Sequence, residues 1–184
     1  MSIYLKILFI FLINNTFLFS QSYKNNWYKI IEKIGDVEIR QYNDLILATY
    51  QNDNSNRSES FRNLASYIFG NNNKNENIGM TSPVIVDLVG VETMHFIMPS
   101  DYQIETMPDP NNDKILLRDV LKCKKAVISY SGFTNKSTET KKINKLKLIL
   151  SERGVSHKND FQVLVYDSPY KFFNRRNEIC VTIK

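Results

Sequence analysis

Short runs of alternating apolar and polar residues recur along the chain and predict β-strands. Residues 37–40 alternate between aliphatic and charged side chains directly after a Gly-Asp turn, so residues 27–42 are predicted to form a hairpin. Polar segments such as residues 51–56 and 71–77 are predicted to be loops. The segments expected to form the remaining strands are 45–50, 84–89, 94–98, 115–117, 126–130, 161–166 and 179–183.

Two longer stretches carry apolar residues three and four positions apart, which is the spacing of one face of an α-helix. The first is predicted to begin at Ser58 and to end before Gly70. The second is predicted to cover residues 138–153 and to end before Gly154. Their apolar positions are Phe61, Leu64, Ala65 and Ile68 in the first helix, and Ile143, Leu146, Ile149 and Leu150 in the second.

The order strand–helix–strand–strand occurs twice, once on each side of a Pro-Asp-Pro segment at residues 108–110. A duplicated βαββ unit of this kind typically builds one antiparallel curved sheet or distorted barrel with two helices packed on it. Neither half alone can cover its strands well, so the halves are predicted to share one core. The expected fold class is therefore α+β, with a single domain over residues 22–184.

The N-terminal segment has the layout of a secretory signal peptide. Lys6 precedes an apolar run over residues 7–19, which is followed by small polar residues. Because a membrane-spanning helix needs about 20 apolar residues, this run is short for crossing a bilayer. We expect residues 1–21 to be removed and the protein to be secreted or periplasmic, with no stable membrane insertion after processing. An uncleaved N-terminal anchor is the alternative.

The composition is that of an ordinary globular protein. Hydrophobic residues make up 42% of the 184 residues and charged residues 23%, so a core of ordinary size can form. The net charge of +5 is spread along the chain and does not form a basic run interleaved with aromatic residues. Nucleic acid is therefore not an expected partner, whereas a mildly cationic surface favours anionic ligands. We expect a monomer.

Common catalytic and metal-binding motifs do not occur in the sequence. It contains no G-x-S-x-G, H-E-x-x-H, P-loop or G-x-G-x-x-G pattern, so no enzyme activity is predicted. His95 alternates with Met94 and Phe96 along a predicted strand, and it points to solvent if those two face the core. His157 lies in a polar loop and is also expected to be solvated.

Cys123 and Cys180 are the two cysteines of the chain. Neither belongs to a C-x-x-C pattern, so a metal knuckle is not indicated. A disulfide formed in an oxidising compartment and two free buried thiols are both compatible with the sequence.

Four segments resemble the SOUL haem-binding family. Residues 28–42 are similar to its opening hairpin, and residues 77–84 (N-I-G-M-T-S-P-V) are similar to its I-x-M-T-x-P-V signature. Residues 94–100 resemble the strand that follows, and the D-S-P and R-R-N-E-I sequences within residues 167–179 resemble the closing element. The similarity runs from Trp27 to the C-terminus. The family's distorted barrel, with a duplicated βαββ unit and two helices, agrees with the repeat described above.

The resemblance implies non-covalent binding of haem or another tetrapyrrole in an apolar groove, in a carrier, buffer or sensor outside the cytoplasm. The groove would lie between the first helix and the loop before the last strand, and Lys171 or Arg175 could pair with the propionates. Some relatives carry a histidine at the position of Gln41, and glutamine is a poor iron ligand, so iron coordination is not expected there. The residues that the resemblance assigns to the groove are Phe61, Leu64, Ala65, Ile68, Lys171, Phe172, Phe173 and Arg175.

Two other functions remain open from the sequence. Duplicated βαββ barrels also serve as small-molecule or protein-interaction modules, which need no haem. A hydrolase or tetrapyrrole-modifying enzyme has less support, because the assigned groove offers only Lys171 and Arg175 as titratable groups. Residues 175–178 could equally form a structural network that ties the loop to the sheet.

Overall fold

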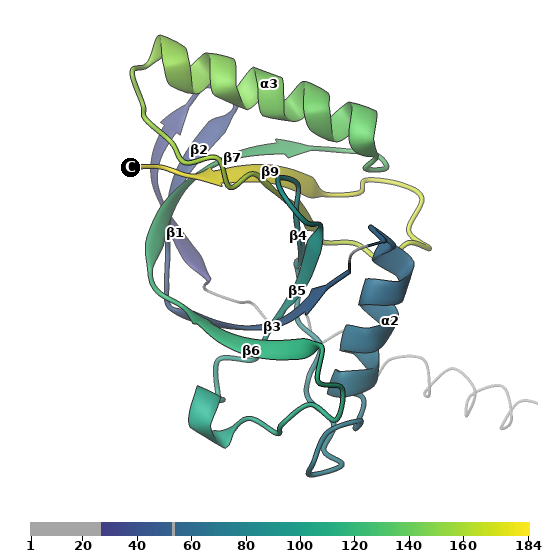
Figure 1. Cartoon of the computed structure of the whole chain (residues 1–184). Helices are drawn as coiled ribbons and strands as arrows, with labels where there is room; N and C mark the ends of the chain where they lie inside the picture. The colour runs from purple at the N-terminus through teal and green to yellow at the C-terminus, as the bar shows by residue number, and fades with distance from the viewer. Residues whose placement is uncertain (1–26, 53) are drawn as a thin grey trace, which may run out of the picture.

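Nine antiparallel strands form one curled, barrel-like sheet with two helices packed on its outside (Figure 1). The computed structural model describes residues 27–52 and 54–184, so the predicted signal peptide lies outside the described residues. The helices are α2 (Arg57–Ile68) and α3 (Lys136–Glu152), with a short 3-10 helix, η1 (Ile104–Thr106). The strands are β1 (Tyr28–Ile34), β2 (Val37–Tyr42), β3 (Leu45–Gln51), β4 (Val84–Asp87), β5 (Thr93–Ile97), β6 (Ile115–Val120), β7 (Cys123–Tyr130), β8 (Gln162–Val165) and β9 (Asn177–Thr182).

The sheet topology confirms the predicted duplication. Strands follow the order β1-β2-β7-β9-β8-β4-β5-β3-β6, so β1 and β6 are the two edges. The pairs β3–β5 and β4–β5 of the first half correspond to β7–β9 and β8–β9 of the second half. The pairs β2–β7, β3–β6 and β4–β8 join the two halves. Because most strands pair across the repeat, neither half has a complete sheet of its own.

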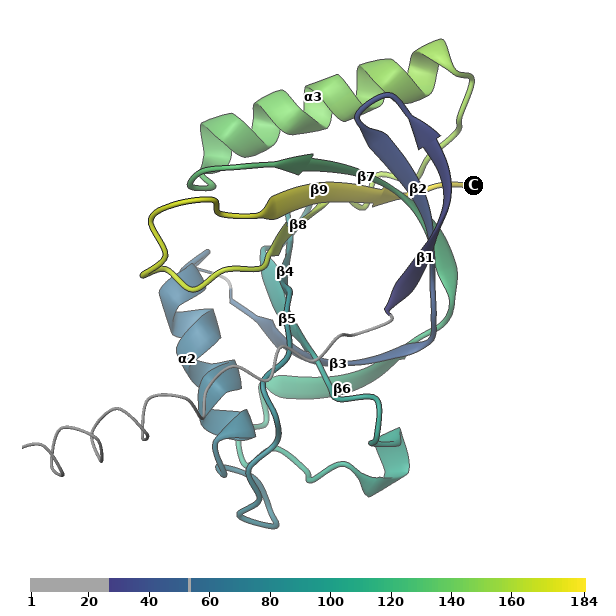
Figure 2. The same cartoon turned by 180° about the vertical axis from the view of Figure 1, so that it is seen from behind.

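Both faces of the curled sheet are buried along its central strands, whereas the edge strands β1 and β6 are largely exposed. The outer face packs against the helices, with α2 on β3 and β5 and α3 on β7 and β9 (Figures 1 and 2). The inner face encloses the barrel interior, where a second apolar cluster forms. On β9, Ile179 and Val181 belong to the outer core, whereas Cys180 belongs to the inner one. A strand in this sheet is therefore buried on both sides, which a simple alternation rule does not anticipate.

Asparagine side chains begin both helices. Asn56 accepts a hydrogen bond from the backbone N–H of Glu59 at 3.1 Å, and Asn135 accepts one from Thr138 at 2.9 Å. The first helix was predicted to begin at Ser58, and this was wrong by one residue because Asn56 is the N-cap. Within the described part of the chain, no helix is long and apolar enough to cross a membrane.

Candidate functional site

Helix α2 uses most of its apolar stripe to pack on the sheet. Leu64 and Ile68, both predicted to line a ligand groove, are fully buried in the outer core. In this conformation both side chains fill the helix–sheet contact and are not exposed to a ligand, so their place in a groove stays a prediction. Ala65 is half-buried at the edge of this core. Phe61 is 36% exposed and packs edge-on against Phe96, with 5.3 Å between the ring centroids.

The loop between β8 and β9 is organised by Arg175. This side chain is 5% exposed, and its Nη1 donates to the backbone carbonyls of Ser168 and Lys171, both at 2.7 Å. Its guanidinium also lies 4.7 Å from the ring centroid of Phe133. Loop carbonyls accept hydrogen bonds from both Nη atoms of Arg175, whereas its buried Nε has no hydrogen-bond partner among the described residues. Pairing of Arg175 with a propionate stays a prediction. Lys171 is exposed and pairs with Asp167 at 2.6 Å.

The loop between β8 and β9 approaches the N-terminal half of α2 (Figures 1 and 2), and exposed aromatic residues belong to both segments. Arg57 of α2 forms a bidentate ion pair with Glu139 of α3, at 2.7 and 3.1 Å, which brings the two helix N-termini together beside Phe133. Phe172 and Phe173 are 70% and 83% exposed. We call the exposed rings of this region the aromatic surface; its members are Phe61, Phe133, Tyr170, Phe172 and Phe173.

The aromatic surface suits a flat apolar ligand but offers no histidine to an iron atom. His157 is half-buried against Phe161, not fully solvated as predicted, and is joined by a bridge to Ile183 at the end of the chain. Gln41 lies on β2 and donates to the backbone carbonyls of Tyr42 and Cys123. Among the described residues, no cluster of three His, Cys, Asp or Glu side chains could hold a metal ion.

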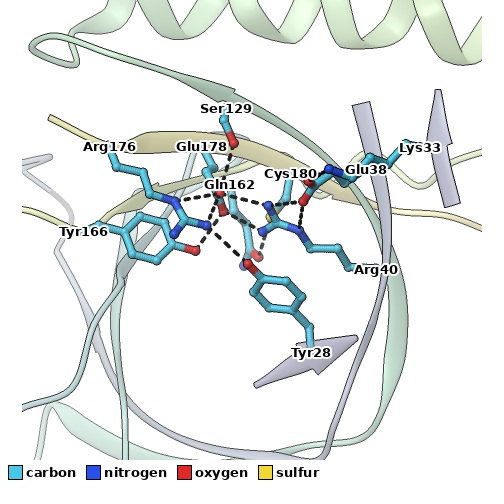
Figure 3. Close-up of polar contacts among 10 residues, drawn as sticks. All are labelled: Tyr28, Lys33, Glu38, Arg40, Ser129, Gln162, Tyr166, Arg176, Glu178 and Cys180. Atoms are coloured by element: carbon cyan, nitrogen blue, oxygen red, sulfur yellow. Dashed lines mark hydrogen bonds and ion pairs between the residues drawn. The ribbon is translucent and has the colours of Figure 1, made fainter. Parts of the chain in front are cut away.

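A cluster of charged side chains occupies one part of the barrel interior (Figure 3). Arg40 of β2 donates two hydrogen bonds to Glu178 of β9, at 2.7 and 2.9 Å. Arg176 and Tyr166 donate to the same carboxylate at 2.7 and 2.8 Å. Arg40 also pairs with Glu38 at 2.7 Å. Arg176 and Glu178 thus belong to a structural network, one of the alternatives that the sequence left open, whereas Arg175 and Asn177 donate to backbone carbonyls of neighbouring loops.

Arginine neighbours keep Glu178 ionised although it is fully buried. Burial by itself would raise the pKa of Glu178, but the hydrogen bonds and charges of Arg40 and Arg176 lower this pKa to about 2. Burial raises the pKa of the Tyr166 hydroxyl, so it stays protonated and remains a donor to the carboxylate. The cluster therefore carries a fixed negative charge that is matched by two arginines at neutral pH.

Acid is expected to remove the contribution of this cluster to stability. The pKa of Glu178 is lower in the folded protein than its ordinary value of 4.5, so its contribution is complete above about pH 4.5 and falls as the pH approaches 2. Urea unfolding between pH 6 and pH 2 measures this loss. The difference between the wild type and Glu178→Gln should shrink as the pH falls. A difference that stays constant over this range would contradict the prediction.

A second polar group lines a cavity of about 160 Å³ elsewhere in the barrel interior. The Thr49 hydroxyl and His95 Nδ1 are 3.0 Å apart, and His95 Nε2 is 3.1 Å from the Asp87 carboxylate. Gln162 donates to Asp87 at 2.7 Å and accepts from the Lys125 ammonium at 2.5 Å. These five side chains come from five strands and form one continuous hydrogen-bonded chain.

The prediction that His95 points to solvent is wrong. His95 is 7% exposed, although Met94 and Phe96 do face the core as assumed. The alternation along β5 is intact, but the opposite face of this strand is the barrel interior and not the solvent. Nothing local in the sequence marks this difference, because a histidine between two apolar residues fits either environment.

The two cysteines are free thiols. Cys123 pairs with Tyr42 and Cys180 pairs with Val127, so four residues of β7, about 13 Å of strand, separate their positions. This separation is too large for a disulfide, which requires Cα atoms within about 7 Å. Burial raises the pKa of the Cys180 thiol to about 11, so this thiol is not a reactive nucleophile at neutral pH.

Comparison with known families and proteins finds a family model over most of the chain and relatives over about two thirds of it. The family model described as SOUL heme-binding protein matches residues 23–182. The chain is 28% identical over 124 residues to heme-binding protein 1 of Xenopus laevis, a match that covers 63% of this chain and 65% of that protein. It is 30% identical over 128 residues to heme-binding protein 2 of Homo sapiens, with 65% and 62% covered. The matches thus span less than two thirds of these relatives.

Solved structures share the fold at low sequence identity. The C-terminal domain of EcmrR superimposes with a TM-score of 0.61 and 10% identity, covering 85% of this chain and 98% of that domain. An uncharacterized conserved protein from Listeria innocua gives a TM-score of 0.61 and 8% identity, covering 81% and 92%. Matches at this level of identity establish a common architecture and carry no information about ligands.

Proposed function

Because this chain belongs to the SOUL heme-binding protein family, we propose that it binds haem or a related tetrapyrrole without a covalent bond. Two relatives are named as heme-binding proteins, which supports the ligand class. The observation in the structure that carries the proposal is the aromatic surface. Exposed aromatic rings on the loop and on the neighbouring helix are costly in water and indicate a surface that a flat apolar ligand can cover.

The aromatic surface would hold the ring through Phe61, Phe133, Phe172 and Phe173. Burial of apolar area alone supports an affinity in the micromolar range, about 8 kcal/mol. Lys171 would exchange its ion pair with Asp167 for one with a propionate. Because ion pairs at an exposed site contribute little, this exchange would change the binding free energy little. When bound, the group supplies the redox and gas-binding chemistry of its iron. The protein orients and carries it, and we propose no catalytic turnover.

We also propose that the protein acts outside the cytoplasm, as a carrier, buffer or sensor. The support is the signal-like pattern of residues 1–21, in which a lysine precedes a short apolar run. If the proposal is correct, N-terminal sequencing of exported protein should begin near residue 22. Exported protein that begins at Met1 or Ser2 would contradict cleavage.

Hemin titration followed at the Soret band tests the ligand. Replacing both Phe172 and Phe173 with serine is expected to weaken hemin binding at least tenfold, because the two most apolar exposed rings of the loop are removed. Iron-free protoporphyrin should bind the wild type about as tightly as hemin, since the affinity comes from apolar contact. Leu148→Ser is the matched control, because Leu148 is 59% exposed on α3 and outside the aromatic surface.

Two results would argue against this proposal. If neither ring shows saturable binding, the fold assignment stands but the chain is a small-molecule or protein-interaction module without a haem role. If hemin binds and protoporphyrin does not, iron coordination governs the site instead of the aromatic surface.

A further inference from the structure

The cavity inside the barrel has the size of a single small ring. Its volume is about 160 Å³, whereas pockets for drug-sized ligands typically measure about 300–1,000 Å³. An engineered cavity of about 150 Å³ in another protein binds benzene. A tetrapyrrole contains four such rings and does not fit. The apolar part of the wall is formed by Leu45, Leu47, Ile85, Val120 and Leu164.

The charges around this cavity are not balanced. Its single carboxylate, Asp87, is already engaged by His95 and Gln162. Burial would raise the pKa of Asp87, but these two partners and the charge of Lys125 lower it, so this group is ionised at neutral pH. The only lining carboxylate therefore has partners on both oxygens.

Among the described residues, neither Lys125 nor the exposed Arg118 forms an ion pair, although the charge of Lys125 acts on Asp87. Lys125 donates to the amide oxygen of Gln162, and its ammonium lies 5.8 Å from the ring centroid of Tyr42. Arg118 on β6 also lines the cavity, and it forms no ion pair within residues 27–52 and 54–184. An anion that enters the cavity would therefore meet two cationic side chains without a paired carboxylate.

We propose that the barrel interior is a second binding site, which takes a small monocarboxylate with an apolar body of about the size of a benzene ring. The carboxylate binds to Arg118 and Lys125, and the apolar body lies against Leu47, Ile85 and Leu164. The hydrogen-bonded chain from Thr49 to Lys125 holds the lysine in place. This site lies on the inner face of the sheet, whereas the aromatic surface lies on the outer face, so one ligand does not exclude the other.

Benzoate is the probe that tests this site, with benzyl alcohol and benzylamine as neutral and cationic analogues of similar size. In titrations of the wild type followed by ligand-observed NMR, benzoate is expected to bind at one saturable site, about tenfold more tightly than either analogue. Arg118→Met should weaken benzoate binding about tenfold and leave benzyl alcohol unchanged, because a charge-assisted hydrogen bond is lost. Arg153→Met removes an exposed arginine at the end of α3 and should change neither affinity.

Two further measurements locate the site. Val120→Phe places a ring in the cavity and should abolish binding of both benzoate and benzyl alcohol. Saturating hemin should leave the affinity for benzoate unchanged. Benzoate should bind whether or not hemin binds, so failure of the tetrapyrrole proposal and failure of the benzoate site can be told apart. The inference is overturned if benzoate does not saturate, if benzylamine binds as well, if a folded Val120→Phe protein still binds benzoate, or if hemin competes.

Discussion

Replacing Glu178 with glutamine is expected to lower the free energy of unfolding by about 3–5 kcal/mol. The side chain is fully buried, and the change in shape is small, so the loss comes from the charge. Arg40, which is 1% exposed, would lose its fully buried carboxylate partner and keep only the partly exposed Glu38. Removing the buried partner of a buried charge is among the most destabilising changes that a single substitution can make. Urea unfolding at pH 7 measures the difference.

The control is an ion pair at the surface. Lys33 pairs with Glu38 at 3.1 Å, but its side chain is 65% exposed, so Lys33→Gln should cost less than about 1 kcal/mol. The double variant Arg40→Met/Glu178→Leu replaces both buried charges with apolar groups. It should be more stable than either single variant, because neither buried charge then remains after its buried partner has been removed. Equal stability of Glu178→Gln and the wild type would show that the cluster does not contribute.

Much of the fold follows from local patterns in the sequence. Residues 37–42 alternate as a strand does, the apolar residues of residues 138–153 repeat as on a helix, and the order of elements repeats across residues 108–110. All three features appear in the structure as β2, α3 and the duplicated topology. These patterns are reliable because each depends only on residues that are close together in the chain.

The contents of the barrel interior do not follow from local patterns. Arg40 and Glu178 are 138 positions apart, and they meet only because β7 lies between β2 and β9. In the sequence Arg40 is simply the polar member of an alternating strand, for which solvent is the ordinary environment. His95 was assigned to solvent for the same reason. A polar residue on a barrel strand is assigned correctly only when closure of the sheet is considered.

The prediction of the ligand-contacting residues on α2 was ambiguous for a related reason. The spacing of Phe61, Leu64, Ala65 and Ile68 shows that one helix face is apolar, but it does not show which of these residues the sheet covers and which remain for a ligand. The structure separates them, because Leu64 and Ile68 fill the core while Phe61 remains partly exposed. Phe172 and Phe173 of the loop are exposed. Their contact with a tetrapyrrole, which the resemblance implies, remains a proposal.

Leu64→Ala is therefore expected to destabilise the protein by about 2–5 kcal/mol while leaving the hemin affinity of the folded protein nearly unchanged. The side chain is fully buried between α2 and the sheet, so its removal leaves a cavity in the core and not a gap at the ligand surface. Phe61→Ala, three residues earlier on the same helix, should show the reverse. It should cost less than about 2 kcal/mol, because the ring is 36% exposed, but it should weaken hemin binding.

Urea unfolding and Soret titration of the same two variants give both quantities. The titration is made under conditions where each variant is folded, so that a loss of stability is not counted as a loss of affinity. If Leu64→Ala weakens hemin binding as much as Phe61→Ala does, then α2 must move away from the sheet to admit the ligand. In that case the groove includes the stripe that is buried in this conformation, and the original assignment of Leu64 and Ile68 would be correct for the bound state.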